Sequence, residues 1–361
     1  MQITMKKKAA SVVGLEVEAG LLAAVELGSN GTVELEKAVT EPLAPGVIHE
    51  GEVVDPERLA AALKELFSRH KLSKQVRLGI GNQAVVVRTL RLPAIEDPKE
   101  LAAAVRFQAA EEMPMPLDQA VLEHQVVGGV PPQGDAPAQI DVVVVAARQE
   151  MITSFVESMR QAGLEPLGID LTAFGMIRAL AGNLAPASTE QEAPGATEEA
   201  ILYCGLGGVT NLAVARGRAC LFTRVSHAGL GPISESLSAS TGLSYDHAVQ
   251  WLTFVGLEQP LDGLEGDPAV AAAAREALES GLVNLADELR LSLDYYRALE
   301  GAVPLTRMVL SGPGSTIPGV VQRMGEMVGL PTEAIRPAAL DGFDAGTAAR
   351  LTLAYGLALE A

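Results

Sequence analysis

The chain carries one structural plan twice, and this repeat limits the folds that it can adopt more than any other feature. Residues 14–39 read GLEVEAGLLAAVELGSNGTVELEKAV, and residues 203–225 read YCGLGGVTNLAVARGRACLFTRV. In both segments short apolar runs alternate with turns of glycine and other small residues, which predicts a β-hairpin followed by a third strand. Each segment opens one half of the 361-residue chain.

Both halves then alternate helical and strand patterns. Asp-Pro pairs at residues 55–56 and 97–98 predict helix starts, with the aspartate as N-cap and the proline in the first turn. The second half has longer helical patterns at 230–256 and 268–298. Two such halves predict a bilobed α/β body with a ligand cleft between its lobes. Two unrelated α/β domains are the alternative.

Charge and cysteine content exclude several classes of protein. A net charge of −18 argues against broad binding to nucleic acid or to anionic lipid, since both require a positive surface. Cys204 and Cys220 lie in apolar runs and are expected to be buried, reduced thiols. The histidines lack zinc-ligand spacing, and no apolar run is long enough to cross a membrane. We therefore expect a cytoplasmic protein without direct membrane insertion.

Four longer segments, read in order, narrow the fold. They are FQAAEEMPMPLDQAVLEHQVV at 107–127, ELRLSLDYY at 288–296, LSGPGSTIPGVVQRMGEMVGLP at 310–331 and the ending LTLAYGLALEA. Together they resemble the PilM family of type IV pilus assembly proteins, relatives of FtsA with the actin-like ATPase fold. FtsA itself is less similar, because that family usually continues into a membrane-binding amphipathic helix, and this chain ends after a core-like helix.

The resemblance implies a domain layout. The expected fold is an α/β, bilobed actin-like fold (a duplicated, ribonuclease H-like unit) with a small α+β subdomain inserted in the first lobe. Residues 10–75 and 169–183 would form the core of the first lobe, 76–168 the insert, and 200–361 the second lobe, whose helical subdomain would span about 230–300. Residues 184–199 are small, acidic and proline-containing, which predicts a mobile linker.

The same resemblance locates a nucleotide site, and the residues there depart from the family pattern. In this fold two hairpin turns hold phosphates through backbone N–H groups, and an acidic residue in each turn helps to hold Mg²⁺. In the first turn Glu16 replaces the usual aspartate, Glu18 stands where glycine is expected, and Ala19 replaces a hydroxyl residue. A carboxylate at that glycine position would repel phosphate.

The second turn and the adenosine loop are only partly preserved. Cys204 or Tyr203 stands where the second turn should carry an aspartate, and Pro313 replaces a glycine of the loop. Taken singly, each surviving glycine is also explained by a tight turn. The residues that the resemblance assigns to these two segments are Gly205, Gly207, Gly208, Thr210, Gly312, Gly314 and Ser315.

These departures predict a vestigial nucleotide site without catalytic residues. We expect neither ATP nor Mg²⁺ to be required and the chain not to be an enzyme, although weak ATP binding stays open. The alternative is an active actin-fold ATPase or an FtsA-like cytoskeletal protein that binds Mg-ATP. Asp170 could orient a water in an active relative, or it could cap the helix that follows it.

PilM-like proteins bind the cytoplasmic N-terminus of PilN, a bitopic membrane protein, between the first lobe and the insert, and they contact pilus motor ATPases. The resemblance therefore implies a scaffold with a PilN-like partner at the inner face of the cytoplasmic membrane, with motor ATPases and self-association as further candidate contacts. Met113 and Met115 suit an adaptable peptide groove. Arg88 and Leu90, on an alternating strand, are the other predicted contacts. The methionines could instead pack in a local core, and the arginine could simply be solvated.

Overall fold

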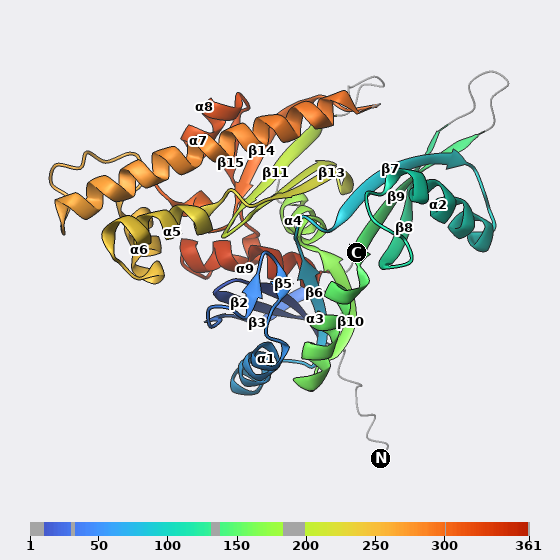
Figure 1. The fold of residues 1–361 in the computed structure, drawn as a ribbon, viewed down its shortest axis with the longest axis horizontal. Helices are drawn as coiled ribbons and strands as arrows, with labels where there is room; N and C mark the ends of the chain where they lie inside the picture. The colour runs from blue at the N-terminus through green and yellow to red at the C-terminus, as the bar shows by residue number, and fades with distance from the viewer. Residues whose placement is uncertain (1–10, 30–32, 131–137, 183–198, 300, 360–361) are drawn as a thin grey trace, which may run out of the picture.

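Two five-stranded sheets of the same topology form the body of the molecule (Figure 1). The computed structural model describes residues 11–29, 33–130, 138–182, 199–299 and 301–359. The linker predicted at 184–199 lies almost entirely outside the described residues. The first sheet contains β1 (Val12–Glu18), β2 (Leu21–Ser29), β3 (Val33–Pro42), β6 (Gln75–Ile80) and β10 (Glu165–Leu171). The second contains β11 (Ala200–Leu206), β12 (Thr210–Arg216), β13 (Ala219–Ser226), β14 (Leu305–Ser311) and β15 (Thr332–Ala334).

The strand orders confirm the predicted duplication. The first sheet is ordered β10-β6-β1-β2-β3, and the second sheet is the same series in reverse listing, β13-β12-β11-β14-β15. In each sheet the first strand pairs antiparallel with the hairpin strand that follows it and parallel with the strand on its other side. Each half is therefore one copy of the same unit, and the fold is bilobed as expected.

Two helices, α4 (Thr172–Ala181) and α9 (Ala345–Ala358), lie against each other between the sheets, and each contacts the sheet of the other half. Apolar residues of α4 pack with Tyr203 and Val309 of the second sheet. Ala348, Leu351 and Ala354 of α9 pack with residues of β2 in the first sheet. The predicted second lobe, 200–361, is therefore too wide, because its last helix is buried on the first sheet.

The contact between α4 and α9 depends on two glycines. A Cβ on Gly356 would lie 1.8 Å from the backbone oxygen of Gly175, so no larger residue fits without moving a helix. Gly14 of β1 meets α9 in the same way, since its Cβ would lie 2.0 Å from the backbone oxygen of Ala354. These glycines hold the two halves at their present separation.

A smaller sheet is inserted into the first half. It consists of β7 (Val86–Pro93), β8 (Ala120–Val130) and β9 (Gln139–Arg148), in the order β7-β9-β8, and α2 (Pro98–Glu112) covers one face. The predicted limits, 76–168, are too wide. Gln75–Ile80 pairs with β1, and both α3 (Gln149–Gln161) and β10 belong to the first lobe.

The helix starts follow the predicted signals. Asp55 caps α1 (Pro56–His70) by accepting a hydrogen bond from the backbone N–H of Arg58 at 3.0 Å, and Asp97 caps α2 through Lys99 and Glu100. A short hairpin, β4 (Ile48–His49) and β5 (Glu52–Val53), precedes α1.

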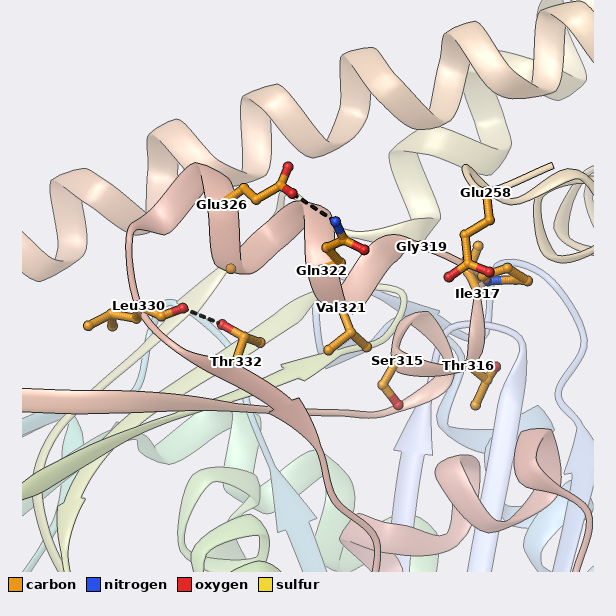
Figure 2. A pocket seen from close by; sticks show the side chains of 12 residues that line it. Glu258, Ser315, Thr316, Ile317, Gly319, Val321, Gln322, Glu326, Leu330 and Thr332 are labelled. Atoms are coloured by element: carbon orange, nitrogen blue, oxygen red, sulfur yellow. Dashed lines mark hydrogen bonds between the residues drawn. The ribbon is translucent and has the colours of Figure 1, made fainter. Parts of the chain in front are cut away.

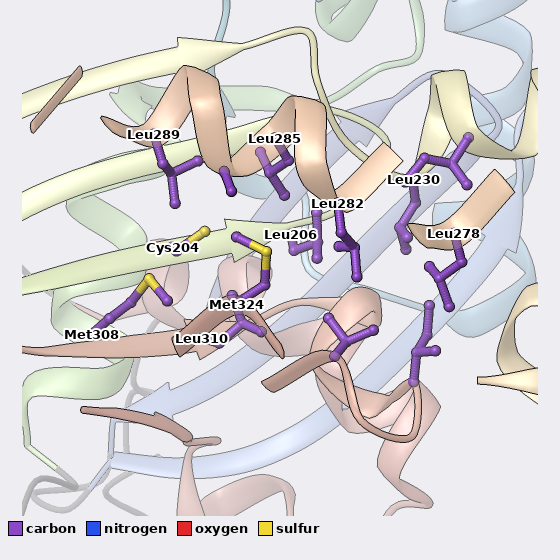
Figure 3. Packing of buried hydrophobic residues seen from close by; sticks show 14 of the residues in the cluster. Cys204, Leu206, Leu230, Leu278, Leu282, Leu285, Leu289, Met308, Leu310 and Met324 are labelled. Carbon is purple, nitrogen blue, oxygen red and sulfur yellow. The ribbon is translucent and has the colours of Figure 1, made fainter. Parts of the chain in front are cut away.

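The second lobe carries its helices on the outer face of the second sheet. The helix predicted at 230–256 is two helices, α5 (Leu230–Thr241) and α6 (Tyr245–Val255), because Gly242 adopts φ 74° and ends the first. The long helix α7 (Pro268–Ala298) buries a row of leucines against β11 and β14 (Figure 3). The remaining elements are the 3₁₀ helix η1 (Pro313–Thr316), α8 (Val320–Val328) and η2 (Ala338–Leu340).

Candidate functional site

The two predicted turns face each other across the junction of the lobes. The β1–β2 turn follows Glu18, and the β11–β12 turn carries Gly207 and Gly208. A Cβ on Gly207 would lie 3.5 Å from Oε2 and 3.7 Å from Oε1 of Glu18. The Glu18 carboxyl group therefore lies directly against the turn that, in the nucleotide-binding pattern, would approach a phosphate.

Glu16, which is buried, and Glu18, which is half-buried, form a pair of carboxyl groups. They are two residues apart on β1, so both side chains point to the same face of the strand. Burial raises the pKa of Glu16 well above its usual value, and the neighbouring Glu18 raises it further. Burial also raises the pKa of Glu18, against the lowering effect of a hydrogen bond from Glu16 and of the Arg350 guanidinium. Both carboxyl groups are therefore harder to ionise than free glutamates.

The space around this pair is small. The cavity that Glu16, Glu18, Gly205 and Gly207 line has a volume of about 20 Å³ for the centre of a water-sized molecule. That is room for one water molecule. Its other walls are Leu21, Asn211, Ser311, Gly312, Pro313, Ala349, Arg350 and Leu353.

Two polar residues that line this cavity, Asn211 and Arg350, belong to no sequence motif that would have assigned them to the site. Arg350 comes from α9 and enters the site because that helix crosses to the first sheet. Asn211, on β12, accepts a hydrogen bond from the Thr172 hydroxyl at 2.8 Å and is buried. The position of Arg350 in the site could be predicted only if one knew that α9 packs on the sheet of the other half.

The predicted nucleotide residues do not all meet in this cavity. Glu16, Glu18, Gly205, Gly207 and Gly312 line it, whereas Ala19, Gly208, Thr210, Gly314 and Ser315 are not part of its wall. The Thr210 hydroxyl is buried and makes no hydrogen bond within the described part of the chain.

The adenosine-type loop packs tightly on β11. Gly312 has φ 78°, and a Cβ there would lie 2.8 Å from the backbone oxygen of Leu206. A Cβ on Gly314 would lie 2.3 Å from the Leu206 side chain. Ser315 donates its hydroxyl to the carbonyl of Gly312 at 2.7 Å. These close contacts account for both glycines without a ligand.

Ser315 lines a different, open hollow of about 560 Å³ beside α8 (Figure 2). Apart from the exposed Glu258, its polar side chains make hydrogen bonds within the protein. The Gln322 amide donates to Glu326 at 2.9 Å, and the hydroxyls of Thr316 and Thr332 donate to nearby carbonyls. The hollow therefore offers no unsatisfied buried group that would indicate a ligand.

Asp170 is held at the end of β10. Its carboxylate accepts a hydrogen bond from the backbone N–H of Leu171 at 2.8 Å and forms a half-buried ion pair with Arg178. Arg178 also donates to the carbonyl of Gly356 at 3.0 Å. Asp170 therefore holds Arg178 of α4, which in turn contacts α9, and α4 begins after Leu171 without a side-chain cap.

The predicted partner-binding residues separate into two groups. Leu90 and Met113 are 1% and 7% exposed and belong to the core between α2 and the insert sheet, so their prediction as surface contacts is wrong. Arg88 and Met115 stay half-buried on that same face. The reason is that α2 covers the face of β7 that carries residues 86, 88, 90 and 92.

The opposite face of β7 turns toward the first lobe. Val87 and Val145 pack against the core of that lobe, and Arg148 of β9 forms an ion pair with Glu52. Further along this face Thr89 is exposed, and Arg91 forms an ion pair with Asp141 at 2.9 Å.

Among the described residues there is no helix long and apolar enough to span a membrane, and there is no cluster of three or more potential metal ligands.

Duplicated sheets with crossed helices and a cleft between hairpin turns define the actin-like class, and solved structures of that class resemble the chain. MreB5 of Spiroplasma citri bound to ADP aligns with a TM-score of 0.54 at 11% identity over 97% of this chain and 95% of that chain. EutJ of Carboxydothermus hydrogenoformans aligns with a TM-score of 0.53 at 12% identity over 96% and 89%.

Within the actin-like class, the comparisons identify a particular family. The model of the type IV pilus assembly protein PilM family matches residues 14–361, and the chain belongs to that family. A chain in the structure of the PilM–PilN type IV pilus biogenesis complex aligns with a TM-score of 0.77 at 26% identity, over 98% of this chain and 98% of that chain.

Proposed function

We propose that the chain is a scaffold of a type IV pilus assembly machine and that it binds the cytoplasmic N-terminal segment of a PilN-like membrane protein. The observation that carries this proposal is the alignment along both full chains with a member of the PilM–PilN complex. Through that partner the scaffold would lie at the inner face of the cytoplasmic membrane.

The binding surface that we propose is the side of the insert that turns toward the first lobe. There Thr89 and Arg91 continue the face on which Val87 packs against the lobe. The exposed hydroxyl and the guanidinium, next to a packed apolar seam, give an extended peptide both polar and apolar contacts. The face covered by α2 is the competing location, with Arg88 and Met115 as its half-buried residues.

The test is calorimetry of the full chain with a synthetic peptide of the cytoplasmic segment of a PilN-like protein. The wild-type chain is expected to bind, and the Arg91→Glu or Thr89→Asp variant is expected to weaken binding at least tenfold. Arg88→Glu, on the α2 face, is the matched control and should bind as the wild type does. Loss of binding in the Arg88 variant alone would move the site to the α2 face, and no binding by the wild type would reject the scaffold function.

We also propose that the cleft does not hold Mg-ATP. Two carboxyl groups, one buried and one half-buried, and room for one water molecule are a poor fit to a triphosphate, because like charges in a low-dielectric site repel strongly. The space between the turns would instead be filled by Glu18 itself.

A link from this scaffold to the pilus motor ATPases is the remaining part of the proposal, and it rests on the family alone. It predicts that the purified chain and a cognate motor ATPase co-elute in size-exclusion chromatography. Separate elution at micromolar concentrations of both would reject it.

A further inference from the structure

The helix α7 turns an apolar row away from the core in its C-terminal half. Leu291, Tyr295 and Leu299 are 62%, 46% and 37% exposed. They are four residues apart, so they follow one ridge of the helix surface. The Tyr295 ring packs on Phe222 of β13 with the ring centroids 6.0 Å apart, which holds it in place. Exposed apolar side chains that gather in this way mark a contact surface.

Charged residues of alternating sign run along one flank of this row. In chain order they are Asp287, Arg290, Asp294 and Arg297. Within the helix, Asp287 pairs with Arg290 at 2.6 Å, and Asp294 pairs with Arg297 at 3.2 Å. All four side chains are about half exposed or more. When two copies of this helix lie antiparallel, each acidic residue of the series therefore lies opposite a basic residue of the other copy, and each basic residue opposite an acidic one.

On the other flank Glu288 lies 3.8 Å from Arg224 of β13. This contact directs the Glu288 side chain toward β13, on the side of the row away from the four charged residues of the first flank. The charge pattern that a partner would meet is set by the four residues of the first flank.

We propose that this row is the interface between two copies of the chain, with their α7 helices antiparallel about a two-fold axis at the level of Ser292. This arrangement places Asp287 opposite Arg297 of the second copy, and Arg290 opposite Asp294 of the second copy. Each pair occurs twice, as an isologous interface requires. The axis also brings the Leu291 and Tyr295 side chains of both copies together.

Charge complementarity selects this occupant and this orientation. In a parallel two-fold pair the charged flank of each helix would face the opposite flank of its partner, so these four charged residues would not meet one another. The antiparallel pair instead sets opposite charges together along the whole flank. One helix face is smaller than the roughly 800 Å² per partner of a stable complex. The dimer is therefore reversible and depends on concentration.

The first experiment is sedimentation equilibrium of the full chain. The wild type is expected to pass from monomer to dimer over the micromolar range, and Leu291→Asp is expected to remain a monomer. Val54→Asp changes another exposed aliphatic residue, which is 60% exposed and far from α7 in sequence, and it should dimerise as the wild type does. Thermal melting of each variant confirms that it is folded. A wild type that remains monomeric at high micromolar concentration overturns the proposal.

The second experiment tests the register by exchanging charges. Asp287→Arg alone sets two arginines opposite each other in a homodimer, and Arg297→Asp alone sets two aspartates opposite each other. Each single variant is expected to be monomeric, whereas a mixture of the two restores both ion pairs and dimerises. Variants that dimerise separately as well as the wild type, or a mixture that stays monomeric, would show that α7 does not pair in this way.

Discussion

Oxygen Oε2 of Glu18 lies 3.5 Å from the position that a Cβ on Gly207 would occupy, so a carboxyl group of the first lobe touches the phosphate-type turn of the second. The side chain crosses the junction of the lobes at the position where the family pattern calls for an anion to be bound by backbone N–H groups. If this acid blocks the cleft, as we propose, both the stability of the protein and its affinity for nucleotide depend on the two glutamates, and two predictions follow from that dependence.

Glu16→Gln is expected to make the stability of the protein less dependent on pH. Burial and the neighbouring Glu18 raise the pKa of Glu16, so the folded chain keeps a proton that the unfolded chain loses near the ordinary value of 4.5. Above that value the folded state binds more protons than the unfolded state, and the free energy of unfolding falls as pH rises. Glutamine is neutral throughout and removes this loss.

The measurement is urea denaturation at a series of pH values between about 5 and 8, which covers the window above the ordinary carboxyl pKa. The wild type should lose stability with rising pH more steeply than Glu16→Gln. Glu157→Gln, on the exposed face of α3, is the control and should follow the wild type. Equal slopes for all three proteins would contradict the raised pKa of Glu16.

Glu18→Gly is expected to increase nucleotide binding. The change removes the carboxylate from the turn and returns the backbone freedom that an anion site uses. The wild type should show no thermal shift with Mg-ATP, while the variant should be stabilised. A ligand at about 100 times its dissociation constant stabilises by about 2.7 kcal/mol, which is readily seen as a rise in melting temperature. A wild-type shift as large as that of the variant would refute the blocked cleft.

The architecture could be predicted from the sequence because residues that are close together in the chain specify most of its elements. The hairpin turns, the Asp-Pro helix starts at Asp55 and Asp97, and the duplicated order of strands all depend on neighbours in the chain. The exchange of α4 and α9 between the halves depends on packing between distant segments. For that reason the domain limits were misplaced and Arg350 was missed.

The insert illustrates a second limit. Alternation along Val86–Pro93 separates the two faces of the strand but does not say which face a helix will cover. Since α2 packs on the face that carries Leu90, a residue expected to meet a partner became part of the core. The carboxyl pair, by contrast, was visible in the sequence, because Glu18 stands where the pattern calls for glycine.

Leu90→Ala is therefore expected to act on stability. Truncating a fully buried leucine leaves a cavity and costs about 2–5 kcal/mol. Urea denaturation should show this loss, and the effect should be concentrated in the insert, where hydrogen exchange of β7 and β9 would accelerate. Met115→Ala, at the half-buried edge of the same cluster, should cost clearly less. A Leu90→Ala variant as stable as the wild type would contradict the packing of α2 on the sheet.

Gly356→Ala tests the contact that joins the two halves. The new methyl group would start 1.8 Å from the backbone oxygen of Gly175, so α4 and α9 must separate, and we expect a loss of about 1–3 kcal/mol or more. Gly182→Ala is the matched control, because Gly182 closes α4 with φ −74° and a Cβ there meets no atom within 4 Å. That change should be neutral or should stabilise by up to about 1 kcal/mol, since alanine restricts the unfolded chain. If the two variants unfold with the same dependence on denaturant concentration, the difference between their denaturation midpoints gives the difference in their free energies of unfolding. Equal stability of the two would mean that the helices do not meet at these glycines.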